Sequence, residues 1–255
     1  MNTWILLRGL TRESRHWGSF ADLVQAELPN DRVALIDLPG CGMLNALESP
    51  LSMAEIAAHC KHEAARLRLS PPYHLLAVSL GAMAAIAWAE AHPEDLAGCV
   101  LINTSLRGLS PIHHRLRPGA YLPLLKLALA RDASVREDTI LRLTSARPRD
   151  FPDTVEAWAG FRNDRPVSAR NALRQLVAAI AYRPPPAAPC KRILVLAGAG
   201  DALVNPACSR QLAIAWHADF AQHPGAGHDL TLDDGPWVVG QIQRWIDGGR
   251  SKSRD

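Results

Sequence analysis

Residues 73–91 read YHLLAVSLGAMAAIAWAEA, and the character of the sequence changes at Ser79. The apolar run before Ser79 is typical of a buried strand, and the alanine-rich residues 82–91 favour a helix. Small residues, Ala77 and Gly81, stand two positions before and after the serine. A serine in such a tight strand-to-helix turn is lifted off the end of the sheet. The stretch therefore predicts an accessible nucleophile where a strand meets a helix.

Short apolar runs of the same kind recur along the whole chain. They are predicted as strands over residues 4–7, 33–37, 73–78, 100–103, 193–197 and 218–222. Predicted helices lie between or after them, over residues 16–28, 52–69, 82–91 and 237–246. Short buried strands that alternate with helices predict an α/β fold, with a mostly parallel sheet and helices on both faces.

Residues 107–189 interrupt this alternation, because they contain helical patterns but no strand pattern. The proline run 184–186 reads as a linker back to the sheet. We therefore predict a core of residues 1–106 and 190–255, with residues 107–189 as a helical cap insertion over one end of the sheet. The apolar stretch that begins at Tyr121 should mainly pack the cap onto the core, with Tyr121 a candidate for the substrate pocket.

Two helix starts carry the pattern of a capping box, in which a serine and a glutamate three residues later satisfy each other's backbone. Ser52 and Glu55 give this pattern before the second predicted helix. Ser134 and Glu137 give it inside the insertion.

Two further loops carry candidate catalytic residues. Residues 198–206, GAGDALVNP, follow a predicted strand and contain Asp201. Residues 224–229, PGAGHD, follow the last predicted strand and contain His228, 27 positions after Asp201. The carboxyl ends of parallel strands share one edge of a sheet, so these two side chains should meet Ser79 there.

Each of these residues also has an ordinary structural explanation. A serine after a strand can cap a helix, and aspartate is common in glycine-rich turns. His228 can be an exposed loop residue, and His223 competes with it, although His223 lies before the Pro-Gly turn. The conjunction of all three residues after strands, in the order Ser, Asp, His, favours the catalytic interpretation.

In order and spacing, these motifs resemble the α/β-hydrolase family. The resemblance implies that Ser79 is the nucleophile, His228 the general base and Asp201 the residue that orients the histidine. It further implies an oxyanion hole built from the backbone N–H groups of Leu80 and Leu10. It implies neither a metal nor an organic cofactor.

One position departs from the family pattern. The family usually has His-Gly after its first conserved strand, and this chain has Arg8-Gly9. One interpretation, which we favour, is that Arg8 supports the loop structurally. The other is that Arg8 faces the pocket and attracts a substrate carboxylate or phosphate.

The size of the chain and its Ser-Leu-Gly motif are similar to those of small cytoplasmic carboxylesterases with a helical cap. The implied function is hydrolysis of a carboxylic ester or thioester through an acyl-enzyme on Ser79. Two alternatives remain open. One is a C–C bond hydrolase, lyase or cofactor-free haloperoxidase on the same fold, and the other is a small-molecule receptor with a slow or vestigial triad.

Composition limits the partners of the protein. The formal net charge is only +3, which argues against nucleic acid as the main partner. Five scattered cysteines without a CxxC pair favour neither a disulfide framework nor a zinc site, and fit a reducing cytoplasm. No stretch approaches the roughly 20 apolar residues of a membrane span. The expected partner is a small-molecule substrate, and composition does not distinguish a monomer from an oligomer.

Overall fold

The computed structural model describes residues 2–252 and contains one parallel sheet in the order β2-β1-β3-β4-β5-β6. All neighbouring strands in it run parallel. The strands are β1 (Thr3–Leu7), β2 (Arg32–Ile36), β3 (Tyr73–Val78), β4 (Leu96–Ile102), β5 (Ile193–Gly198) and β6 (Asp219–His223). The predicted α/β fold is confirmed, and each predicted strand coincides with an observed one to within a few residues.

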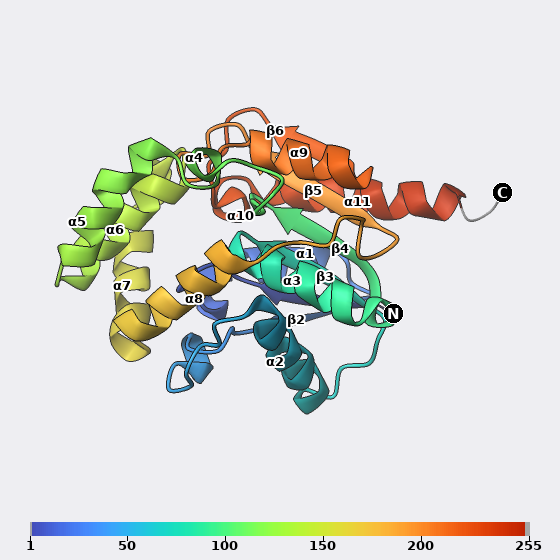
Figure 1. The fold of residues 1–255 in the computed structure, drawn as a ribbon, viewed down its shortest axis with the longest axis horizontal. Helices are drawn as coiled ribbons and strands as arrows, with labels where there is room; N and C mark the ends of the chain where they lie inside the picture. Colours follow the sequence, from blue (N-terminus) through green and yellow to red (C-terminus); the bar gives the residue numbers. More distant parts are fainter. Residues whose placement is uncertain (1, 253–255) are drawn as a thin grey trace.

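Helices cover both faces of the sheet (Figure 1). One face carries α2 (Met53–Arg66), α3 (Leu80–Ala91) and α9 (Ala207–Trp216), and the other carries α1 (Phe20–Glu27) and α11 (Gly235–Lys252). Successive strand side chains point to opposite faces, so Ile5 and Leu7 enter one core while Trp4 and Leu6 enter the other.

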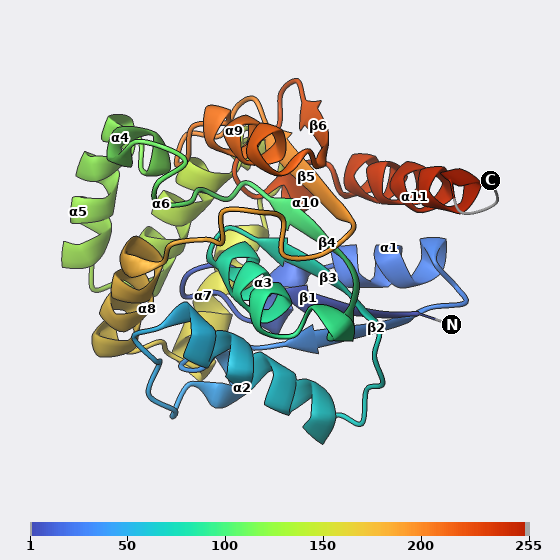
Figure 2. The same ribbon diagram turned by 45° about the vertical axis from the view of Figure 1, so that its right-hand side comes forward.

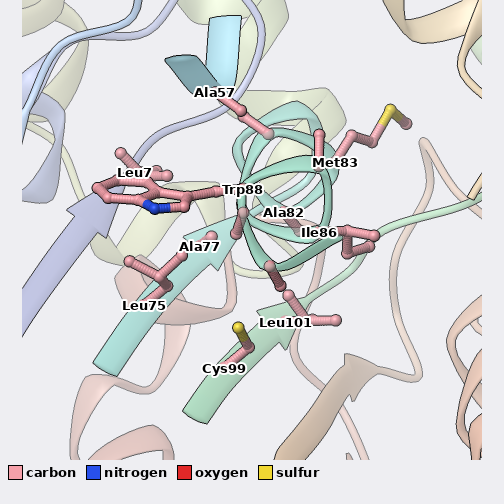
Figure 3. Close-up of a cluster of buried hydrophobic side chains, with 14 of the residues drawn as sticks. Leu7, Ala57, Leu75, Ala77, Ala82, Met83, Ile86, Trp88, Cys99 and Leu101 are labelled. Carbon is pink, nitrogen blue, oxygen red and sulfur yellow. The ribbon is translucent and has the colours of Figure 1, made fainter. Parts of the chain in front are cut away.

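Helix α3 packs on the sheet beside α2, and it is buried continuously from Leu80 to Ala89. Figure 3 shows side chains of the adjacent strands, among them Ala77 and Leu101, directed at Ala82 and the neighbouring turns of α3. A helix that is apolar on all sides suits such a fully enclosed position. Its burial fixes the first turn of α3, which begins immediately after Ser79.

Between β4 and β5, the chain forms helices and adds no strand to the sheet. They are α4 (Ile112–Arg115), α5 (Tyr121–Leu129), α6 (Ala133–Thr144), α7 (Thr154–Asp164) and α8 (Ala169–Ala181). Figures 1 and 2 place these helices beyond the end of the sheet toward which the strands point. We keep residues 107–189 as the proposed bounds of a cap.

The remaining helical elements are short. They are α10 (Leu230–Asp233) and 3-10 turns at Ser14–Trp17, Gly42–Leu44, Pro93–Asp95, Pro118–Ala120 and Pro148–Asp150. The helix predicted over residues 16–28 is divided into one of these turns and α1, and Gly18 with a φ of 52° separates the two. Within residues 2–252, no helix combines the length and apolar character needed to cross a membrane.

The predictions of two capping boxes are wrong, because neither serine caps its helix with a side-chain hydrogen bond. Ser52 precedes α2 as expected, but its side chain makes no capping hydrogen bond. Helix α6 is capped instead by Asp132, whose carboxylate accepts a 2.9 Å hydrogen bond from the Val135 amide. Glu137 is unavailable for capping because it is buried and forms ion pairs with arginines of the core and the cap.

Candidate active site

Ser79 occupies a strained turn between β3 and α3, with φ 56° and ψ −115°. This backbone conformation is unfavourable for any residue that has a Cβ atom. Gly81 is required in the same turn, because a Cβ atom there would lie 2.5 Å from the carbonyl oxygens of Leu7 and Arg8. The close approach of β1 and the enclosed α3 hold the turn and present Ser79 at the carboxyl end of β3.

Asp201 and His228 meet as the sequence predicted, although they lie 27 residues apart. His228 Nδ1 lies 2.7 Å from Asp201 Oδ2, and both side chains are buried. The other carboxylate oxygen, Oδ1, accepts 2.8 Å hydrogen bonds from the amides of Leu203 and Val204. The carboxylate is therefore fixed by the loop that follows β5, with one oxygen left to orient the imidazole.

The environment of His228 strengthens it as a base. Burial alone lowers the pKa of the imidazole, but the charge and hydrogen bond of Asp201 outweigh burial, and the pKa is raised above its ordinary value. A buried carboxylate beside Nδ1 favours the tautomer that leaves Nε2 free to accept a proton.

Ser79 and His228 line the same cavity. Within residues 2–252, the Ser79 hydroxyl makes no hydrogen bond, so the contact between serine and histidine is open in this structure. Catalytic hydrogen bonds are often open in enzymes without substrate and close when substrate binds. The structure thus brings Ser79 and His228 to one cavity and Asp201 to His228, so one of the two expected contacts is formed.

Of the two predicted oxyanion-hole donors, Leu10 lines this cavity, and Leu80 directly follows Ser79, which lines it. The backbone amides of Leu80 and Leu10 donate no hydrogen bond to any residue of the described chain. Leu80 is the first residue of α3, where the helix dipole adds positive potential. Leu10 lines the cavity and follows Gly9, whose added Cβ would lie 3.2 Å from the Cβ of Ser79.

The cavity is small, about 120 Å³, and mainly apolar. Its apolar lining consists of Leu10, Val78, Leu124, Leu127, Ile140, Leu143 and Leu203. Helices α5 and α6 supply four of these side chains, so residues of the predicted cap form the wall opposite the sheet.

The prediction for Tyr121 is wrong. This side chain is 48% exposed and does not line the cavity. Tyr121 belongs to the first turn of α5, whereas the cavity is lined by the later residues Leu124 and Leu127.

Arg8 does border the cavity, but its charge is paired with a buried carboxylate of the protein. Its guanidinium forms a buried ion pair with Asp229, at 2.5 Å between Nη2 and Oδ2. It also lies over the Trp17 ring, 4.8 Å from the centroid. This arrangement favours the structural interpretation of Arg8 over attraction of a substrate anion.

Asn103, which no sequence motif singles out, holds together the two loops that carry the candidate residues Asp201 and His228. Its side-chain nitrogen donates to the carbonyls of Gly227 and His228, at 3.0 and 2.8 Å. Its side-chain oxygen accepts from the Gly198 amide at 2.9 Å. The only local signal was a polar residue at the end of the predicted strand 100–103.

A buried ionic link that the sequence does not reveal joins the core to the predicted cap. Glu137 of α6 contacts Arg12 of the core at 2.7 Å and Arg162 of α7 at 2.5 Å. Arg12 stacks on Trp158 at 4.4 Å and borders the cavity.

Among residues 2–252, no group of three histidine, cysteine or acidic side chains could hold a metal ion.

Comparisons with known proteins agree with this architecture. The model of the alpha/beta hydrolase family matches residues 4–241. Among curated proteins, the chain is similar to the pimeloyl-[acyl-carrier protein] methyl ester esterase of Xanthomonas axonopodis pv. citri. The two are 26% identical over 258 residues, which cover 91% of this chain and 90% of the relative.

Solved structures share the fold at lower identity. A thermophilic esterase from Thermogutta terrifontis superposes with a TM-score of 0.73 at 21% identity, over 97% of this chain and 90% of that chain. A candidate non-heme bromoperoxidase from Mycobacterium tuberculosis gives 0.76 at 20% identity, over 97% and 92%. Because the family model spans nearly the whole sequence, the chain belongs to the alpha/beta hydrolase family and is carboxylesterase-like within it.

Proposed function

We propose that the protein is a serine esterase that hydrolyses a carboxylic ester or thioester through an acyl-enzyme on Ser79. The observation that carries the proposal is the buried 2.7 Å contact between His228 and Asp201, at the cavity that Ser79 also lines. A buried, carboxylate-oriented histidine beside a serine in a strained turn fits nucleophilic acyl transfer.

In the proposed first half-reaction, the Ser79 oxygen attacks the carbonyl carbon while His228 Nε2 accepts the serine proton. The N–H groups of Leu10 and Leu80 stabilise the resulting oxyanion, each by about 3 kcal/mol. Collapse of this intermediate breaks the bond to the alcohol or thiol, which leaves with the proton from His228. Asp201 stabilises the imidazolium that forms between these two proton transfers.

In the second half-reaction, His228 takes a proton from water as the water oxygen attacks the acyl-enzyme. The intermediate collapses to the carboxylic acid, and the proton returns to Ser79. The small apolar cavity, which Leu124, Leu127 and Leu143 help to line, supports a short or medium acyl group in place of a long chain. The methyl ester esterases to which the chain is similar support an ester as the substrate class.

The test is hydrolysis of p-nitrophenyl esters of increasing acyl length by the wild type, Ser79→Ala and Ser52→Ala. Ser52 is a matched control, because its side chain makes no capping hydrogen bond and it lies outside the cavity. We expect activity in the wild type and in Ser52→Ala, and a loss of about 10³-fold or more in Ser79→Ala. Equal activity in Ser79→Ala, or no turnover of any ester by the wild type, would refute the proposal and favour the lyase or receptor alternatives.

A further inference from the structure

We propose that Arg8 and Asp229 form a positioning pair that holds the oxyanion-hole loop and the loop of the general base in one fixed geometry. This inference rests on the proposed function. It assigns to the pair a role in placing other groups, and neither residue is assigned a contact with the reacting atoms.

The geometry of the pair suits such a role. Arg8 Nη2 lies 2.5 Å from Asp229 Oδ2, and Arg8 Nη1 lies 3.2 Å from Asp229 Oδ1. Both side chains are 5% exposed. A planar guanidinium bound through two nitrogens to both carboxylate oxygens fixes orientation as well as distance. In a buried site, such a pair has little freedom to move unless one of its loops moves with it.

The two partners are adjacent in sequence to the groups that must be aligned. Arg8 stands two residues before Leu10, the proposed oxyanion donor, and Gly9 between them packs against Ser79. Asp229 directly follows His228, the proposed base. The pair therefore joins two loops that are 221 residues apart in sequence and face the same cavity.

Further contacts fix Asp229 from other directions. Thr231 Oγ1 donates to Asp229 Oδ1 at 2.8 Å and accepts from Arg8 Nη1 at 3.3 Å. The Asp229 amide donates to the carbonyl of Thr144, the last residue of α6, at 2.7 Å. The Asp229 carboxylate thus accepts hydrogen bonds from Arg8 and from Thr231, and the Asp229 amide is bonded to the end of α6.

The pair also balances charge beside the base. His228 is influenced by Asp201 from the loop after β5, by Asp229 on its own loop, and by Arg8 from the loop after β1. The negative Asp229 raises the pKa of His228 and the positive Arg8 lowers it, so the two effects oppose each other. Two other charges adjoin the loop: Arg12 acts on Asp229, and the Asp233 carboxylate of α10 accepts from the Gly227 amide at 2.6 Å.

Removal of one partner should therefore leave the other as an unpaired buried charge next to the base. In Arg8→Gln, the remaining Asp229 carboxylate should raise the pKa of His228. In Asp229→Asn, the remaining Arg8 guanidinium should lower it. These opposite shifts test whether both charges act on the base, whereas a fall in kcat tests whether the pair positions the two loops.

The experiment compares wild type, Arg8→Gln, Arg8→Lys, Asp229→Asn and the double variant Arg8→Gln/Asp229→Asn. We expect kcat to fall on the order of 10²-fold in Arg8→Gln, as for a displaced catalytic geometry, with a smaller change in KM. The acidic limb of the pH profile should move to higher pH in Arg8→Gln and to lower pH in Asp229→Asn. The double variant should recover part of kcat and return the limb toward that of the wild type.

Asp95→Asn provides a matched control with the same chemical change. Asp95 contacts Lys61 at 2.7 Å and accepts from Trp88 at 3.1 Å, next to the amino end of β4 and outside the cavity lining. This control should lose stability without moving the pH profile. Arg8→Lys keeps the charge but loses the two-point contact, so it should lower kcat without the upward shift of the acidic limb.

Two readouts separate this inference from the proposed function. The pKa of His228 can be measured by following its imidazole NMR signals as the pH changes. Ser79 can be labelled with a fluorophosphonate. Neither measurement needs a substrate. If the wild type hydrolyses no ester, the proposed function fails, while opposite NMR shifts in Arg8→Gln and Asp229→Asn still support the placement of both charges beside His228. Shifts that are absent or of the same sign, or unchanged kcat in both folded single variants, would overturn it.

Discussion

The strained backbone of Ser79 predicts that the protein becomes more stable when this residue is replaced by glycine. With φ 56° and ψ −115°, Ser79 lies in a region that glycine enters freely and other residues enter at a cost of about 1–3 kcal/mol. Ser79→Ala keeps the Cβ atom and therefore keeps this strain. Both variants lack the hydroxyl, which makes no hydrogen bond within the described chain, so their comparison isolates the backbone effect.

Two opposing contributions determine the expected size of the difference. Relief of strain stabilises Ser79→Gly, whereas the greater freedom of glycine in the unfolded chain costs about 0.5–1 kcal/mol. The net expectation is that Ser79→Gly is more stable than Ser79→Ala by about 1 kcal/mol. For a chain of this size, that difference corresponds to about 2–4 °C in Tm.

The assay is urea and thermal unfolding of wild type, Ser79→Ala and Ser79→Gly under identical conditions. Ser79→Ala should match the wild type closely, and Ser79→Gly should unfold at higher urea concentration and temperature. Both variants should be inactive. If Ser79→Gly is no more stable than Ser79→Ala, the turn is not strained in solution, and the argument from backbone conformation is refuted.

Other predictions concern the turn, the base, the sheet and the cavity. Gly81→Ala should abolish activity and destabilise the fold by about 3 kcal/mol in urea unfolding, because its methyl group would lie 2.5 Å from two carbonyl oxygens at the end of β1; Gly160→Ala, with open space around it, should not destabilise. The raised pKa of His228 should place the acidic limb of kcat/KM above pH 6.5, since the protonated imidazole accepts no proton, and Asp201→Asn should lower kcat about 10⁴-fold. Burial lowers the pKa of His74 to about 4, so this histidine stays neutral in the fold and binds its proton more readily when unfolded. Stability should therefore fall by about 3 kcal/mol between neutral pH and pH 4, and His74→Phe should remove most of that dependence in urea titrations at several pH values. Leu143→Phe should shorten the preferred acyl chain in the p-nitrophenyl series, and an unchanged optimum would show that the acyl group lies elsewhere.

The sheet and the three candidate catalytic residues were predictable because their signals are local. A strand buried on both faces must be apolar along its length, so β3 and β5 stand out in the sequence. The loops with Ser79, Asp201 and His228 contain small residues, which tight turns at the end of a sheet require.

The contacts that could not be predicted join residues that are distant in sequence. Asn103 bonds to a loop 124 residues away, and Arg8 pairs with a residue 221 positions away. Nothing near either residue specifies its partner. The start of α6 shows the same limit, because Asp132 and Ser134 are both good capping residues. The choice between them depends on Glu137, whose ion pairs reach outside the helix.

The hydrogen bond between Asp229 and Thr144 limits how the enzyme can acquire a new specificity. The end of α6 is packed against the histidine loop so closely that a Cβ atom on Gly227 would lie 2.6 Å from the Thr144 carbonyl oxygen. A chimera that exchanges the whole insertion replaces this contact and displaces the base together with the pocket wall. A graft confined to α5 changes Leu124 and Leu127 and leaves the contact intact. Laboratory recombination and natural divergence should therefore remodel the pocket through α5, while the end of α6 evolves together with the catalytic loop.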